Sequence, residues 1–180
     1  MLRRLLLSFL LLGTLTCPAS AAPDIGSVRI DSTPVRTWQE LVKKSELIVV
    51  SWVDTASQSA ATGRTVSGGK LFNYVQTVQV KQAVKGSAPR LIKLVSTGVE
   101  PLPDARSPLN LTYPGPLAEG SYVLFLHRVA GDGLYSTTGI WQGVYPLQQG
   151  KTIALEGTGF PELNQLTVEE ITRRIKSVSP

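Results

Sequence analysis

The stretch GSYVLFLHRVAGDG, Gly120–Gly133, carries the strongest structural signal of the chain and contains its only histidine, His127. Residues 122–126 are apolar at every position, so both faces of an extended segment would be buried. A short apolar run that ends at a glycine-rich turn is typical of a strand inside a barrel or a sandwich. We therefore predict a strand that ends near His127 and a hairpin turn at residues 130–133.

More short strands are predicted on both sides of this stretch. Apolar or alternating patterns favour strands at residues 47–53, 72–84, 90–96, 134–138, 141–147 and 152–155. Capping patterns at Thr37 and Thr167 predict a short helix that ends near Ser45 and an amphipathic helix near the C-terminus. Many short strands with regular turns indicate a mainly β fold, a small five- to six-stranded β-barrel with these two helices beside it.

Two segments have the pattern of neither a strand nor a helix. Thr55 to Gly69 is rich in Ser, Thr, Gly and Ala and is predicted to be a mobile loop. Gly98 to Gly120 contains five prolines, which argue against a helix or a central strand. Long loops in compact domains are usually functional or linkers. We expect these two loops to form the adjustable binding surfaces of the domain.

The N-terminus has the pattern of a secretory signal peptide. A positive head at Arg3 and Arg4 precedes an apolar stretch, and Ala19-Ser20-Ala21 forms a small-residue cleavage site before Ala22. The apolar stretch is too short to span a bilayer, which takes about 20 apolar residues. We predict three parts: a signal peptide at 1–21, an extended mature N-terminus at 22–36 and a single domain at 37–180. The mature chain is expected to be extracytoplasmic, periplasmic or secreted, with no transmembrane helix after cleavage.

The charge of the mature chain argues against nucleic acid as a partner. Cleavage removes two of the 18 basic residues and none of the 13 acidic ones, so the net charge falls from +5 to +3. The basic residues are scattered and lack the interleaved aromatic residues of a nucleic-acid groove. Cleavage also removes the only cysteine, so the domain has no disulfide and depends on its own core. We expect no nucleic acid as partner, and instead an extracytoplasmic protein or a cell-envelope polymer.

No residue pattern assigns an active site. A zinc site needs several Cys, His or carboxylate ligands, and the mature chain has one histidine and no cysteine, so neither a metal nor a cofactor is predicted. A Ser-His-Asp enzyme would depend on His127 as its base, but a lone histidine at a strand end usually meets solvent or a backbone carbonyl. We expect a non-enzymatic binding module. Two alternatives stay open: a structural envelope component, and a hydrolase that uses His127 or loop carboxylates.

Trp141 and Tyr145 are the candidate ligand-binding residues. They lie close to Gly139 and Gly143, and aromatic rings stack well on apolar faces such as those of sugar rings. The alternative is that both rings belong to the core of the barrel and the two glycines to turns. No catalytic or metal-binding residue is assigned beside them.

The strand pattern also resembles a known family. The matching segments are Ser45–Val49, Tyr74–Gly86, Leu117–Leu126 and Gln142–Val144. Their order resembles the netrin-like barrel of tissue inhibitors of metalloproteinases, and is similar to secreted bacterial proteins of uncharacterised function. The resemblance spans residues 37–147 and implies an OB-like, five-stranded Greek-key barrel with flanking helices. In the animal inhibitors an N-terminal cysteine coordinates the zinc of the target protease. The mature chain here has no cysteine, so that activity is not carried over.

Overall fold

Seven strands form the main part of the regular secondary structure in the computed structural model, which describes residues 24–129 and 133–178. They are β1 (Leu47–Val66), β2 (Gly69–Lys85), β3 (Leu91–Glu100), β4 (Gly120–Arg128), β5 (Leu134–Thr137), β6 (Val144–Gln148) and β7 (Lys151–Thr152). The fold is mainly β, as the sequence predicts. The predicted signal peptide at 1–21 and the hairpin turn at 130–132 lie outside the described residues.

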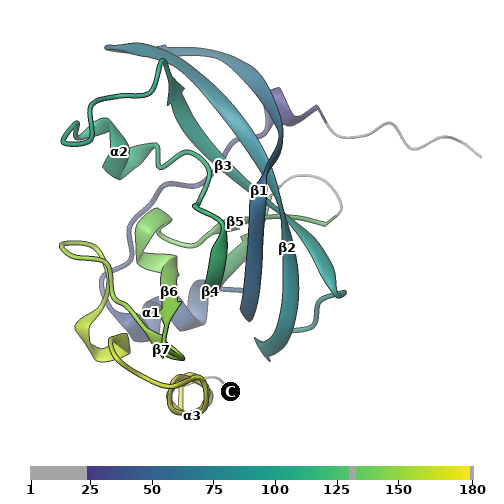
Figure 1. Ribbon diagram of the computed structural model, residues 1–180, viewed down its shortest axis with the longest axis vertical. Helices are drawn as coiled ribbons and strands as arrows, with labels where there is room; N and C mark the ends of the chain where they lie inside the picture. The colour runs from purple at the N-terminus through teal and green to yellow at the C-terminus, as the bar shows by residue number, and fades with distance from the viewer. Residues whose placement is uncertain (1–23, 130–132, 179–180) are drawn as a thin grey trace, which may run out of the picture.

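The strand pairings form a closed path that runs from β1 through β2, β3, β5 and β4 and returns to β1. The sheet order is β1-β2-β3-β5-β4-β6-β7, and β1 also pairs with β4 (Figure 1). All these pairs are antiparallel except β3–β5, which is parallel. A parallel pair needs a long connection. Here the connection runs first through residues 101–119 and then through β4. We call residues 101–119 the excursion.

Both predicted helices are present. The helical elements are η1 (Ile25–Ser27), α1 (Trp38–Lys44), α2 (Leu109–Thr112), η2 (Ile140–Gly143), η3 (Pro161–Leu163) and α3 (Val168–Lys176). Thr167 and Glu170 form the full capping box at the start of α3, with bonds of 3.2 and 2.8 Å. At α1 the Thr37 hydroxyl accepts from the Glu40 amide as predicted, but the Glu40 carboxylate accepts from the Arg36 amide instead of the Thr37 amide.

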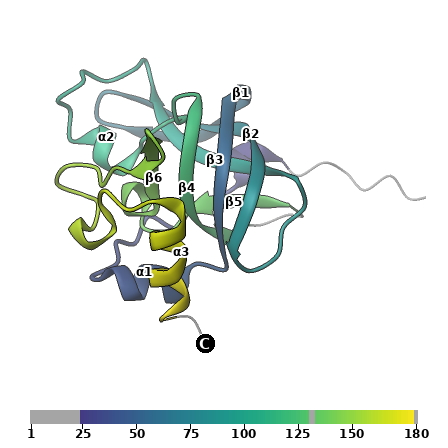
Figure 2. The same cartoon turned by 60° about the horizontal axis from the view of Figure 1, so that its bottom comes forward.

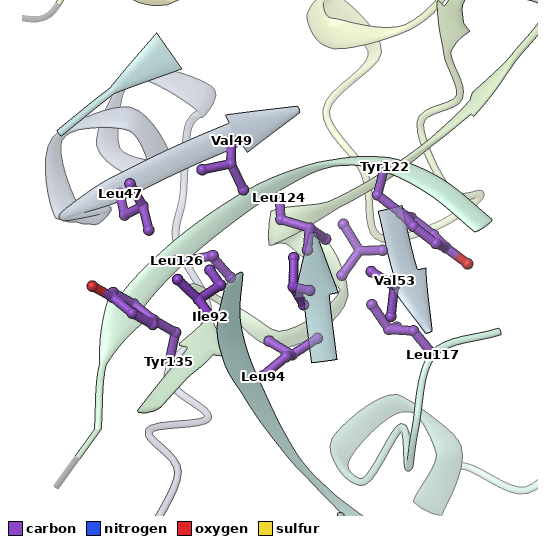
Figure 3. Close-up of a cluster of buried hydrophobic side chains, with 12 residues drawn as sticks. Leu47, Val49, Val53, Ile92, Leu94, Leu117, Tyr122, Leu124, Leu126 and Tyr135 are labelled. Atoms are coloured by element: carbon purple, nitrogen blue, oxygen red, sulfur yellow. The ribbon is translucent and has the colours of Figure 1, made fainter. Parts of the chain in front are cut away.

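The apolar run in β4 is buried on both faces, which confirms the prediction for this strand. Leu124 and Leu126 point into the ring of strands, where they meet side chains of β1 and β3 (Figure 3). Phe125 points to the other side and packs in a second cluster with residues of α1 and α3, such as Ile171. The two helices lie together against this side of the strands (Figure 2). Successive residues of a strand alternate between faces, so one short apolar segment joins both clusters.

The prediction of a mobile loop at Thr55 to Gly69 is wrong. The structure extends β1 to Val66 and begins β2 at Gly69, so this segment forms the far half of a long hairpin. The turn uses Gly68, whose φ of 107° lies in the left-handed region that glycine adopts readily. Most side chains in this half of β1 are exposed. The hydrophobic alternation that marks a strand is therefore missing, while the backbone still pairs with β2.

Three further boundaries differ from the prediction. The second predicted loop, Gly98 to Gly120, is shorter, because β3 continues to Glu100 and the excursion begins at Pro101. The strand predicted at 141–147 begins only at Val144, since η2 precedes it, and the one predicted at 152–155 is the two-residue β7. In the described part of the chain, no helix is long and apolar enough to cross a membrane.

Candidate functional site

Trp141 lies in η2, between β5 and β6. The turn depends on Gly139, which has a φ of 67°, and on Gly143, where an added Cβ would lie 2.6 Å from the Thr138 carbonyl oxygen. This local backbone places the indole ring against the excursion. The indole Nε1 donates a hydrogen bond of 2.7 Å to the Asn110 carbonyl oxygen in α2. The bond fixes the orientation of the ring and leaves it only partly buried.

A surface groove of about 330 Å³ runs along Trp141. One wall is the excursion, with Asn110 and Leu111, and the other is the segment after β7, with Leu155, Glu156 and Thr158. Trp141 and Leu155 also pack on the core inside the ring of strands, so the floor of the groove is anchored. Leu111 is 59% exposed. We call this feature the Trp141 groove, and its lining is mainly apolar with one charged residue, Glu156.

Tyr145 does not lie at this groove or at the surface. Its side chain is fully buried in β6, and its ring meets the Phe125 ring edge-on at 5.6 Å between centroids. The Tyr145 hydroxyl accepts a hydrogen bond of 3.0 Å from the Phe160 amide. Burial raises the pKa of Tyr145 far above its usual value. The predicted stacking role is therefore wrong for Tyr145, whose ring has no free face, and it stays a prediction for Trp141.

Three amide side chains, of which two are fully buried and Gln142 is partly buried, tie non-strand segments to the rest of the fold, and the sequence analysis assigned none of them this role. Gln76 donates to the carbonyl oxygens of Asp54 (2.7 Å) and Leu117 (2.9 Å) and accepts from the Leu117 amide (2.7 Å). Gln142 makes the same two-way contact with the backbone of Val35. The third, a buried asparagine on β2, bonds two carbonyl groups of the N-terminal segment. For the two amides on β2, a polar side chain within a strand pattern was the only signal that the sequence offered, whereas Gln142 lies in η2.

His127 is the second-last residue of β4, close to the predicted strand end, and it is partly buried. Its Nδ1 lies 3.5 Å from the Thr138 hydroxyl oxygen, and that hydroxyl is also 3.1 Å from the hydroxyl of Ser45. Nε2 is buried and has no hydrogen-bond partner within the described residues. Burial lowers the pKa of His127, and the nearby carboxylates of Asp31 and Glu46 oppose this shift. Thr138 is only 5% exposed, so the arrangement does not present a nucleophile to a substrate.

The remaining polar surface gives no metal centre. Across residues 24–129 and 133–178, no group of three or more His, Cys, Asp or Glu side chains converges to hold an ion. The loop carboxylate that is best defined, Glu100, accepts a hydrogen bond of 2.5 Å from the hydroxyl of Tyr74. Burial and this carboxylate raise the pKa of Tyr74 to about 12. The pair ties β2 to the end of β3, at the start of the excursion.

Comparison with protein-family models, with curated proteins and with solved structures finds no significant match to the chain.

Proposed function

We propose that the chain is an extracytoplasmic binding module with no catalytic role, built on an OB-like barrel of the netrin-like type. Its partner is an extracytoplasmic protein, which it holds through the Trp141 groove. Export rests on the signal-peptide pattern at residues 1–21. The barrel is supported by the strand order, because an OB-fold is a five-stranded, partly open Greek-key barrel. The return of the pairing from β4 to β1 agrees with such a ring.

The observation that carries the proposal is apolar exposure concentrated on the excursion. Leu102 is 89% and Leu111 59% exposed, and both belong to this segment. The side chain of Leu111 also lines the groove, together with the partly buried ring of Trp141. Large apolar side chains that gather around a hollow mark an interaction surface more often than single exposed leucines do. Gln76 fixes the excursion near its C-terminal end and Trp141 fixes it near its middle, so the surface is held in place before a partner arrives.

The chemistry of the groove favours a protein segment over a sugar polymer. Leu111 and Leu155 are aliphatic and match an apolar side chain of a partner. A sugar ring would need several polar groups beside the tryptophan to bond its hydroxyls, whereas the exposed lining is mainly apolar although Asn110 and Thr158 belong to it. The only charged residue of the lining, Glu156, favours a basic residue next to that apolar anchor. We therefore infer a partner segment with an apolar side chain and an adjacent lysine or arginine.

A binding experiment with two leucine variants tests this function. The mature chain is used to isolate partners from the extracytoplasmic fraction of its host, and each recovered protein is purified and measured for direct binding. Leu111→Asp places a charge in the groove and is expected to weaken binding at least tenfold. Leu91→Asp is the matched control, since Leu91 is 57% exposed and begins β3, at the end opposite to the excursion.

Two results would contradict the proposal. One is a partner whose affinity falls equally for both variants, because binding would then not use the groove. The other is binding only to isolated wall polymer, which would favour the structural envelope role instead.

A further inference from the structure

A second hollow in the molecule is lined by hydroxyl groups. It has a volume of about 90 Å³ and lies on the other side of the excursion from the Trp141 groove. The excursion contributes Thr112, Tyr113 and Pro114 to it, whereas Asn110 and Leu111 belong to the groove. The other walls come from the N-terminal segment, β3, β5 and the far half of β1. We call this feature the hydroxyl cavity.

We propose that the hydroxyl cavity binds a compact carboxylate, with the carboxyl group at Arg64 and a short polar stem among the hydroxyls. This site is separate from the proposed protein-binding groove. It does not depend on that function.

The hydroxyls around the cavity are not all used by the fold. The Ser96 hydroxyl oxygen is buried and has no hydrogen-bond partner among the described residues. Leaving such a group unpaired costs free energy, which a rotation of the Ser96 side chain toward a ligand in the cavity would recover. Thr97, next to it, already donates to the Asn73 side chain at 2.6 Å. Ser136 and Thr137 of β5, the strand that pairs with β3, are two more hydroxyl-bearing residues of the lining.

The charge at the cavity specifies an anion. Arg64 is the single charged residue of the lining, and it forms no ion pair with any described residue. The nearest acid along the lining segment is Asp31, whose carboxylate accepts from the Thr33 amide at 2.9 Å. Guanidinium groups bind carboxylates through two parallel hydrogen bonds. A guanidinium group beside hydroxyl-bearing side chains therefore matches a carboxylate better than it matches a cation or a neutral apolar ligand.

The size of the cavity limits the ligand. A site must offer at least roughly 10–15 Å³ for a single water, so about 90 Å³ holds several water-sized groups. A carboxyl group with one or two further carbons and a hydroxyl fits this space, whereas a complete sugar or nucleotide does not. Ile30 and Ile140 supply apolar contacts for the carbon atoms of such a stem. The ligand is either a free small acid or the carboxyl end of a larger molecule.

Titration of the ¹⁵N-labelled mature chain with small acids tests the proposal by NMR. L-lactate is the first probe and its neutral amide, lactamide, is the control for charge. The dipeptide Ala-Ala and its C-terminal amide form a second pair, which distinguishes a free acid from a chain end. We expect saturable shifts at amides of residues 96–97, 112–113 and 136–137, a millimolar Kd for an acid, and a Kd at least fivefold higher for its amide.

Variants of the lining supply the decisive comparison. Arg64→Gln is expected to raise the Kd at least fivefold, and Ser96→Val to abolish saturation by removing the hydroxyl and filling space. Arg90→Gln removes another exposed arginine, one that does not line the cavity, and it is expected to leave the Kd unchanged. All variants are compared only if their amide spectra keep the dispersion of the parent chain.

The proposal is overturned by any of three results: no saturation up to tens of millimolar acid, equal binding of acid and amide, or equal effects of the Arg64 and Arg90 variants.

Discussion

Replacing Gln76 by leucine tests how the excursion is held. The Gln76 side chain is fully buried in β2 and makes three hydrogen bonds to backbone groups, two of them to Leu117 at the end of the excursion. Leucine has a similar size but can neither donate nor accept. The variant therefore leaves the Leu117 amide, the Leu117 carbonyl and the Asp54 carbonyl without this partner.

The expected loss can be worked out from these bonds. A typical hydrogen bond contributes about 1 kcal/mol net, and unpaired buried groups cost more. Three bonds therefore correspond to about 3 kcal/mol of the free energy of unfolding. For a domain of roughly 150–250 residues, 1 kcal/mol shifts Tm by about 2–4 °C. Gln76→Leu is therefore expected to lower Tm by about 6–12 °C.

Thermal unfolding followed by circular dichroism measures this shift, and hydrogen exchange at the Leu117 amide shows where the structure opens. Gln79→Leu is the matched control. Gln79 lies three residues further along β2, is only partly buried, and reaches the Asp54 carboxylate at 3.3–3.4 Å. Its replacement is expected to change Tm by less than about 2 °C. Equal shifts for the two variants, or unchanged exchange at Leu117, would refute the idea that Gln76 anchors the excursion.

Three smaller predictions follow from single side chains. Because burial lowers the pKa of His127, the unfolded state binds the proton more readily than the folded state. The free energy of unfolding is therefore expected to fall as pH drops below about 6.5. Urea midpoints measured at several pH values should show that His127→Asn removes this pH dependence. Tyr145→Phe deletes the acceptor of the Phe160 amide and should cost about 1 kcal/mol in urea unfolding, while ligand binding at the Trp141 groove is unchanged. Thr167→Ala breaks the capping box of α3 and should also cost about 1 kcal/mol; no loss in the same assay would show that the cap is dispensable.

Parts of the fold could be predicted because their sequence signals come from local rules. The β4 sequence is apolar at successive positions, and this pattern is needed only in a strand whose two faces are both buried. Thr37 and Thr167 mark both helix starts because a hydroxyl before a helix can accept from its free amides. The second half of β1 could not be found in this way. Its pairing with β2 is made by the backbone, and its exposed Ser, Thr and Ala side chains carry no alternation.

The candidate sites were only partly accessible from the sequence. Trp141 was found as an aromatic residue next to two glycines, and the same reasoning selected Tyr145, which is buried. Both residues have the same local pattern, and only the packing of β6 against Phe125 separates them. The hydroxyl cavity had no sequence signal. Its lining runs from residue 30 to residue 140, and these residues come together only through the ring of strand pairings.

Site-specific photo-crosslinking tests the proposed binding surface most directly. A photoreactive phenylalanine analogue replaces Leu111 in one variant and Leu91 in another. The two leucines are nearly equally exposed, but Leu111 lies in the excursion and Leu91 at the start of β3. Both variants are produced in the host of the chain and irradiated in intact cells. The account predicts a discrete protein adduct from position 111 that is absent from position 91. The same adducts from both positions, or none from position 111, would contradict it.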